Sequence, residues 1–231
     1  MKKNIFRLIK NISFLAFIYL FIFSFVYFIL EPKTLKSATD TKYVTLNQEV
    51  TAEISLTCSS TVSGLTAING ITGGTSNGEF SCNVVTNNST GYNMTLKKIE
   101  LLCHSTLGCG TNKQFDDYST TSDPIDYNWA NTPEGQEYWG FNVSSSSYPT
   151  AVTQRFKDNG TQCNTGSNVS DGKCWTRIPT NPTTETVVNR TTATSPSGDN
   201  TYFGIRIQAG SSNALNSGTY TTTIVVTTST N

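Results

Sequence analysis

The sequence predicts an all-β protein, an antiparallel β-sandwich with long loops, preceded by one N-terminal transmembrane helix. Three observations support this prediction. A long apolar run lies near the N-terminus, short alternating segments separated by turn residues follow it, and all six cysteines come after the run. Beyond residue 38 no segment keeps a helical hydrophobic period over several turns, so the pattern there favours strands.

The N-terminal apolar run, residues 12–30, is long enough to cross a membrane. Its 19 residues would span about 28 Å as a helix, close to the roughly 30 Å hydrocarbon core of a bilayer. Residues 1–11 carry Lys2, Lys3, Arg7 and Lys10, and such basic side chains favour a cytoplasmic location. The sequence therefore predicts a cytoplasmic basic segment followed by a transmembrane helix or signal core.

A cleavable signal peptide usually has a shorter apolar core and small residues before its cleavage site. The best such site is Lys36-Ser37-Ala38, where a lysine stands in place of a small residue. We therefore expect an uncleaved signal-anchor in the cell membrane, single-pass, with the C-terminal domain extracytoplasmic. The alternative is secretion after cleavage near Ala38.

The net charge of zero is the sum of two oppositely charged parts. Residues 1–38 hold six Lys and Arg against one Glu, a net of +5, and residues 39–231 hold ten against fifteen, a net of −5. Leu, Ile, Val and Phe make up 34 of the 193 residues after residue 38, a share below the roughly 20 % at which disorder becomes a concern. This composition argues against a basic nucleic-acid binder, a polytopic membrane protein and a large helical enzyme.

Residues 43–58 carry the clearest strand signal. Apolar side chains occupy even positions from Val44 to Cys58 and polar ones occupy odd positions, with Gln48 as the one interruption. This alternation predicts one face toward a core and one toward water. A bend beside Gln48 would divide the run into two strands. With residues 31–42 as a linker, the sequence predicts a single extracytoplasmic β-sandwich domain over residues 43–231.

Other alternating segments complete the expected sandwich. Residues 80–84 and 92–96 are joined by the turn 86–91, and together they predict a β-hairpin. The other expected strands are residues 138–143, 203–207 and 220–226. Polar loops are expected over residues 103–136 and 144–200.

The cysteines indicate an oxidising compartment. An even number of cysteines beyond an export signal predicts disulfides, and paired C-x-x-C spacings, which would favour a zinc site, are missing. Six cysteines allow 15 connectivities. We favour sequential pairing, because two of the loops are short and the first two cysteines each lie in an expected strand. The favoured pairs are Cys58 with Cys82, Cys103 with Cys109, and Cys163 with Cys174.

Two blocks of the sequence are similar to known surface proteins. The turn Thr86-Asn-Asn-Ser-Thr-Gly-Tyr92 and the ending from Ser217 to Val226 resemble the WxL-domain-like group of bacterial cell-surface β-sandwich proteins. The ending also looks like that of secreted pilus-subunit families. The chain has no W-x-L motif, since the residue two positions after each tryptophan is not leucine in Trp129-Ala-Asn, Trp139-Gly-Phe and Trp175-Thr-Arg. The resemblance implies a surface sandwich without catalytic residues.

A cluster of carboxylates and aromatic rings lies in the loop 116–141. Carboxylates with backbone carbonyls suit calcium, and rings beside carboxylates suit sugars, but no regular calcium loop is present. The candidate ligand residues are Asp116, Asp117, Asp123, Asp126, Trp129 and Trp139.

Taken together, these patterns predict a non-enzymatic surface protein with a structural or interaction role at the bacterial envelope. The alternative is a glycan- or calcium-binding module that uses the loop 116–141. We expect no cofactor, no resident metal and no nucleic-acid partner. The expected partners are the membrane, through the N-terminal helix, and an envelope protein or glycan.

Overall fold

The computed structural model describes residues 2–29, 40–118, 125–130 and 134–231. It divides the chain into two compact units, Met1–Glu49 and Val50–Asn231. We call the second unit the β domain. The candidate ligand residue Asp123 lies outside the described residues.

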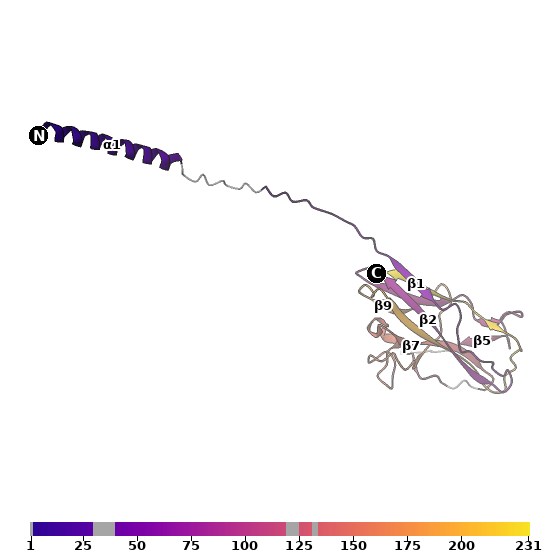
Figure 1. Cartoon of the computed structure of the whole chain (residues 1–231). Coiled ribbons are helices and arrows are strands. Elements are labelled where there is room, and N and C mark those ends of the chain that lie inside the picture. Colours follow the sequence, from indigo (N-terminus) through magenta and orange to yellow (C-terminus); the bar gives the residue numbers. More distant parts are fainter. Residues whose placement is uncertain (1, 30–39, 119–124, 131–133) are drawn as a thin grey trace. The chain divides into compact units, whose positions relative to one another are not determined.

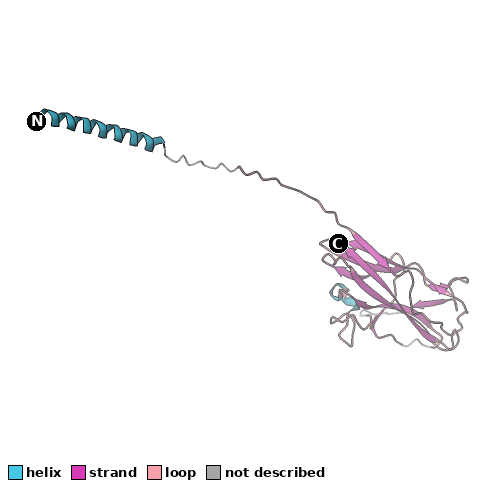
Figure 2. Cartoon of the chain, viewed as in Figure 1, coloured by secondary structure: helices cyan, strands magenta, loops and turns pink. Residues whose placement is uncertain are grey.

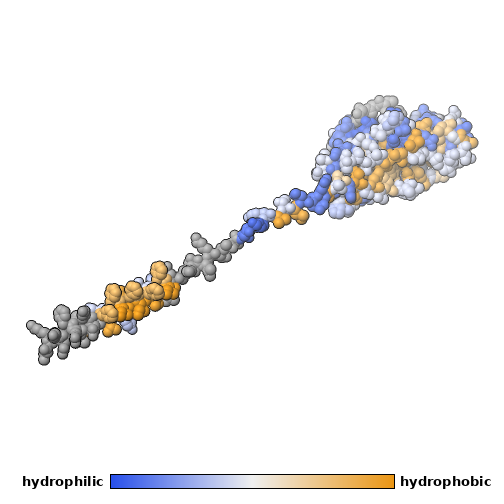
Figure 3. Space-filling view, turned by 90° about the horizontal axis from the view of Figure 1, so that it is seen from above, coloured by the Kyte–Doolittle hydropathy of each residue, from blue (hydrophilic) through white to orange (hydrophobic). Residues whose placement is uncertain are grey.

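The first unit contains helix α1, Lys2–Ile29 (Figures 1 and 2). Its portion Ile12–Ile29 is long and apolar enough to cross a membrane, and the side chains drawn there are largely orange in the hydropathy colouring of Figure 3. The apolar helix predicted from the sequence is therefore present, and it also includes most of the basic segment. A signal-anchor and a cleavable signal peptide both have this form.

The β domain is mostly strand and turn (Figure 2). In the described part of the chain, its larger sheet has the order β1-β2-β10-β7-β5-β4-β11, its second sheet has the order β12-β3-β9, and β6 pairs with β8. The strands are β1 (Ile54–Cys58), β2 (Gly74–Thr86), β3 (Tyr92–Lys98), β4 (Leu102–His104), β5 (Gln114–Asp117), β6 (Asp126–Tyr127), β7 (Glu137–Ser146), β8 (Cys174–Trp175), β9 (Glu185–Arg190), β10 (Asp199–Ala209), β11 (Tyr220–Thr221) and β12 (Ile224–Thr230).

The larger sheet is mixed, which differs from the purely antiparallel arrangement expected. Strand β5 runs parallel to β7, with Asp116 opposite Tyr138 and Asp117 opposite Trp139, whereas the other paired strands are antiparallel. A parallel pair needs a long connection between its strands. The chain from Asp117 to Glu137 provides that connection, and its polar composition gave no sign of the pairing.

Both sheets contribute to one apolar core. Alternate side chains of β2, β3 and β10 are buried, as the period-2 pattern requires. Phe80 and Phe203 stack with ring centroids 4.8 Å apart, and Phe141 and Phe156 lie 5.4 Å apart. The alternating residues of the sequence therefore form the centre of the domain.

The expected strand over residues 43–58 is wrong in its first part, because strand β1 begins only at Ile54 (Figure 2). Residues 43–53 have no strand partner, and Tyr43, Val44 and Leu46 are at least 90 % exposed. The reason is the length of the neighbouring strand: Ile54 pairs with Thr86, the last residue of β2. Beyond that residue the neighbouring chain is a turn, residues 87–91, and offers no strand for the alternating segment to pair with.

The expected hairpin between residues 80–84 and 92–96 is also wrong. Both segments are strands, but β2 pairs with β1 and β10, whereas β3 pairs with β12 and β9. The turn between them therefore connects the two sheets. Gly91 in this turn has φ +82°, and a Cβ atom there would lie 2.0 Å from the carbonyl oxygen of Arg190. The glycine permits both the left-handed backbone and the close approach.

The stretch 144–200, expected to be loop, contributes to the core. It contains strands β8 and β9 and two short 3-10 helices, Pro149–Ala151 and Gln154–Phe156. Its buried apolar side chains are Ala151, Val152, Phe156, Cys163, Val169, Cys174, Ile178, Val187 and Val188. These residues are spread thinly among polar ones, so neither a 2-residue nor a 3.6-residue period shows in the sequence.

The six cysteines form the three sequential disulfides that the sequence favoured, Cys58–Cys82, Cys103–Cys109 and Cys163–Cys174. The first joins β1 to β2 at directly opposite positions. The third closes a loop of the stretch 144–200. Disulfides limit the freedom of the unfolded chain, and this stabilisation suits a domain with few large apolar residues.

A buried ion pair joins the two sheets. Arg190 on β9 donates to Asp199 on β10 at 2.5 Å, and its guanidinium lies 3.7 Å from the centre of the Tyr148 ring. The remaining guanidinium nitrogens donate to the carbonyls of Thr192 and Ala193. Tyr92 donates to the same carboxylate at 3.4 Å. Burial, reinforced by the charge of Asp199, raises the pKa of Tyr92.

Candidate binding groove

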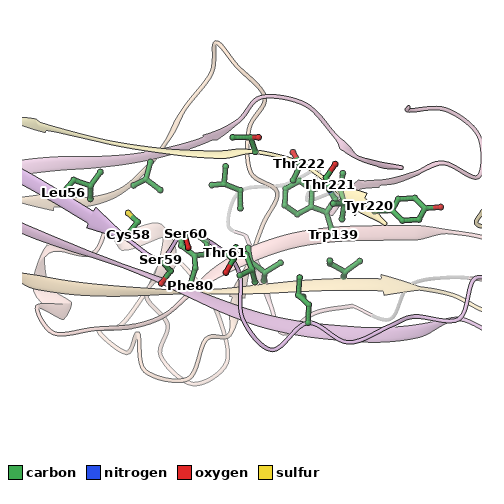
Figure 4. A pocket seen from close by; sticks show the side chains of 18 residues that line it. Leu56, Cys58, Ser59, Ser60, Thr61, Phe80, Trp139, Tyr220, Thr221 and Thr222 are labelled. Atoms are coloured by element: carbon green, nitrogen blue, oxygen red, sulfur yellow. The ribbon is translucent and has the colours of Figure 1, made fainter. Parts of the chain in front are cut away.

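An open apolar groove of about 690 Å³ lies between the two edge strands β1 and β12. One side is formed by β1 and residues 59–65, and the other by residues 220–226. Figure 4 shows Leu56 and Cys58 toward one end and Trp139 and Tyr220 toward the other. The side chains that form its apolar surface are Leu56, Val62, Leu65, Phe80, Leu102, Trp139, Ile205, Ile207, Tyr220, Ile224 and Val226.

Strand β12 borders the groove with an unpaired backbone edge. On β3, Lys98 donates its N–H to Pro179 and accepts from the N–H of Asn181, so these groups point away from β12. Ile224, directly opposite Lys98, must therefore turn its own N–H and C=O away from β3. Alternation along an antiparallel strand gives Val226 and Thr228 the same orientation. In the described part of the chain, the outer edge of β12 has no strand partner.

The two features coincide, because Ile224 and Val226 also contribute side chains to the groove. A bound polypeptide could thus pair with the backbone of β12 and place every second side chain on the apolar surface. Leu65 on the opposite side is 43 % exposed. Among the described lining residues, Tyr220 is the one titratable side chain, and burial raises its pKa. The groove therefore offers apolar contacts and backbone hydrogen bonds rather than acid–base groups.

A second hollow of about 830 Å³ adjoins the groove. The two share Leu65, Leu102, Ile207 and Tyr220. The second hollow is bordered by residues 65–72 and 215–218. The apolar surface thus continues beyond the N-terminal end of β12, towards residues 215–218. In the face shown in Figure 3, orange residues form a band across the β domain between blue and white ones.

The described candidate ligand residues of the loop 116–141 are engaged by other side chains or packed inside the domain. Asp117 pairs with the buried ammonium of Lys98, and Asp126 accepts a hydrogen bond of 2.7 Å from Tyr118. Asp116 is exposed on β5 and accepts a hydrogen bond from Gln114. In the part of the chain that the structure describes, no three His, Cys, Asp or Glu side chains are grouped as metal ligands would be.

The two candidate tryptophans are packed inside the domain. Trp129 is 8 % exposed and stacks on Tyr118, and Trp175 meets its ring edge-on. Trp139 is 2 % exposed and belongs to the core, where its indole also reaches the floor of the groove. Neither ring presents an open face of the kind on which a sugar stacks. Burial raises the pKa of Tyr118, beside this cluster.

Lys98 is the ion-pair partner of Asp117, although nothing in the sequence indicated this contact. Its side chain is fully buried, donates to Asp117 and to the carbonyl of Ile178, and lies 5.5 Å from the centre of the Trp139 ring. Desolvation lowers the pKa of Lys98, and the hydrogen bond and charge of Asp117 oppose this effect. Asp117 balances the buried charge of Lys98, and this carboxylate is therefore already engaged within the β domain.

Calcium at millimolar concentration is expected to leave the tryptophan fluorescence of the full chain unchanged. Asp117 and Asp126 are engaged by Lys98 and Tyr118, so binding would have to break these contacts. The measurement is a calcium titration with magnesium as control. A saturable change that is lost in Asp126→Asn would contradict the expectation.

The groove itself was not predicted from the sequence. Its residues come from six separate segments of the chain, and no segment by itself carries a pattern that indicates a binding site. Comparison with known proteins adds no further guide: no family model and no curated protein matches this chain.

Proposed function

We propose that this chain is an exported, membrane-tethered and non-enzymatic protein of the bacterial envelope, which acts by binding an extended polypeptide segment. The observation that carries the proposal is the open groove beside the unpaired edge of β12. Large apolar surfaces exposed on a monomer mark sites of interaction. A strand added to a sheet edge gains main-chain hydrogen bonds, and pockets for alternate side chains give specificity.

The location of the protein is inferred from two features. Helix α1 has the length and apolarity of a membrane anchor, and three disulfides fit an oxidising compartment outside the cytoplasm. In this proposal α1 remains attached and holds the β domain at the outer surface. The β domain is then a β-sandwich with an open groove on the side where β1 and β12 are its edge strands.

The shape and chemistry of the groove favour a polypeptide over a small molecule. Sites for small molecules are usually enclosed and carry a few polar groups that fix the ligand's orientation. This groove is open along its length, and its polar side chains are mainly the hydroxyls of residues 59–61 and 221–223. The backbone edge of β12 supplies regularly spaced donors and acceptors, which an extended chain matches.

A short peptide with valine at alternate positions, threonine between them and a lysine at each end is expected to bind the groove. The test is fluorescence anisotropy of the labelled peptide with the full chain in detergent, diluted to nanomolar concentration. Val226→Asp should weaken binding at least tenfold, since it places a charge on the apolar surface. The matched control is Thr227→Asp, whose side chain is exposed.

A peptide of the same composition with its valines in one block serves as the second control. Equal binding of both peptides would mean that the site does not read an extended strand. No binding of the alternating peptide, or equal binding to Val226→Asp and Thr227→Asp, would overturn the proposed function.

A further inference from the structure

We propose that His104 forms a pH-sensitive latch, which joins two neighbouring loops at neutral pH and releases them in acid. His104 is the one histidine of the chain. It is the last residue of β4 and is 6 % exposed. This inference goes beyond the proposed function, because it concerns how the fold responds to pH and not what the groove binds.

The hydrogen bonds of the imidazole ring require its neutral form. Nδ1 lies 3.2 Å from the backbone nitrogens of both Thr106 and Leu107, and Nε2 lies 3.1 Å from the carbonyl oxygen of Ser217. A backbone N–H only donates and a carbonyl only accepts. Nδ1 must therefore present its lone pair to the two N–H groups, and Nε2 must carry the ring proton.

These contacts, which we call the His104 latch, join two separate parts of the chain. On one side is the turn 104–109, which a disulfide closes. On the other side are residues 217–220. A Cβ atom at Gly218 would lie 2.2 Å from Nε2, so the close approach requires glycine. Tyr220 pairs directly with His104, and their ring centroids lie 5.3 Å apart. Because Tyr220 lines both the groove and the second hollow, the latch supports a side chain that the two hollows share.

A second turn of the same kind shows that this turn does not by itself require histidine. The Oδ1 atom of Asn159 accepts hydrogen bonds of 3.0 Å from the backbone N–H groups of Thr161 and Gln162. These donors stand two and three positions along the chain, as they do at His104. An asparagine oxygen can thus hold such a turn. Histidine adds a donor to the neighbouring loop and a charge that changes between about pH 5 and 8.

Uptake of a proton at Nδ1 is incompatible with the latch. The added hydrogen would point at the N–H groups of Thr106 and Leu107, and both would lose their acceptor. The Thr106 hydroxyl, 3.3 Å from Nδ1, could accept from the charged ring but leaves the two N–H groups unpaired. The turn must therefore open before the ring binds a proton, so acid favours the open form.

The charged groups around the ring do not offset a positive charge. The titratable neighbours of His104 are Tyr220 on β11 and Lys113, whose carbonyl accepts from the backbone N–H of His104 at 2.7 Å. The carboxylate of Glu137 on β7 acts electrostatically on Tyr220. Within the described ranges of the chain, no Asp or Glu forms an ion pair with His104.

NMR of the full chain in detergent, labelled with ¹⁵N, tests the inference directly, because one histidine gives one pair of ring nitrogen signals. At about pH 7.5 we expect a neutral ring protonated at Nε2. Between about pH 7.5 and about pH 5, the protection of the Thr106 and Leu107 amides against hydrogen exchange should fall roughly tenfold or more. A ring protonated at Nδ1 at about pH 7.5 would overturn the inference.

The variant His104→Asn is the matched control for the pH dependence. It keeps a side-chain acceptor for the turn and does not titrate. Dividing the exchange rates of the wild type by those of the variant at each pH removes the intrinsic effect of pH on exchange. We expect the protection of the Thr106 and Leu107 amides in the variant to stay the same at both pH values. An equal loss in acid in the two proteins would show that the histidine does not control the turn.

The variant Gly218→Ala should release the latch without acid, because the added Cβ atom occupies the position of the ring. At about pH 7.5 its turn 104–109 should lose the protection that the wild type loses in acid. Gly110→Ala is the control, since Gly110 also has a positive φ but a Cβ atom there has no neighbour within 4 Å. Equal loss of protection in these two variants would contradict the role assigned to the contact between the loops.

Discussion

Replacing Asp199 with alanine is expected to lower the free energy of unfolding of the β domain by about 3–5 kcal/mol, because it leaves a buried guanidinium without its carboxylate. Arg190 and Asp199 are 9 % and 7 % exposed in their side chains. The carbonyls of Thr192 and Ala193 still accept hydrogen bonds from Arg190, but neither carries a compensating charge. The measurement is urea unfolding of the full chain in detergent, followed by tryptophan fluorescence.

A double variant separates the loss of the pair from the penalty of an unpaired charge. Arg190→Met with Asp199→Leu removes both charges and is expected to recover most of the lost stability, since apolar replacement of a buried pair is often neutral. If Asp199→Ala costs less than about 1 kcal/mol, the pair behaves like an exposed ion pair, and its role in joining the two sheets would be refuted.

Replacing Asp117 with alanine is expected to destabilise the β domain by about 3–5 kcal/mol at neutral pH, because Lys98 then stays buried without a counter-charge. The Lys98 side chain is fully buried and retains the carbonyl of Ile178 at 2.7 Å and the Trp139 ring at 5.5 Å, neither of which carries a negative charge. The neighbouring Asp116→Ala is the matched control. Asp116 is exposed on the same strand, so its loss should cost little.

The cost of Asp117→Ala is expected to fall as the pH rises. Burial already lowers the pKa of Lys98 below its ordinary value of 10.5, and Asp117 opposes that effect; without Asp117 the pKa falls further. Between this lowered value and about 10.5 the unfolded chain binds more protons than the folded one, so the free energy of unfolding of the variant increases with pH. Urea unfolding of the variant and the wild type at about pH 7 and about pH 9 measures this. A cost that does not change would show that Lys98 is not the group left unpaired.

The sequence predicted the strands better than their partners. Alternation at Phe80, Tyr92 and Phe203 reports which side chains face a core, and these residues are buried. Alternation carries no information on which strands pair with one another. For this reason β2 and β3 were predicted to form a hairpin, although they lie in different sheets. Residues 43–50 show the same limit in reverse: their side chains alternate in the sequence, but β2 ends at Thr86 and offers them no partner.

Proximity in sequence was a poor guide to the site. The carboxylates and rings of the loop 116–141 lie close along the chain, yet Trp139 faces the core, and Asp117 and Asp126 are bound to Lys98 and Tyr118. The groove has the opposite character, because β1, β10 and β12 meet there from distant parts of the chain. Only pairing of the strands creates it, and no local motif could have indicated it.

The disulfide between Cys58 and Cys82 has a mechanical consequence. A pulling force that reaches the β domain through the chain before Val50 acts first on the hydrogen bonds of residues 51–53 with Thr86 and Asn87. It then acts on β1, whose residues can be peeled from β2 one hydrogen bond at a time. The peeling must stop at Cys58, where the covalent bond transfers the load to β2. That strand is paired with β10 over eleven positions from Gly74 to Val84. The disulfide thus acts as a stop that limits extension under load to residues 51–53 and the first four residues of β1.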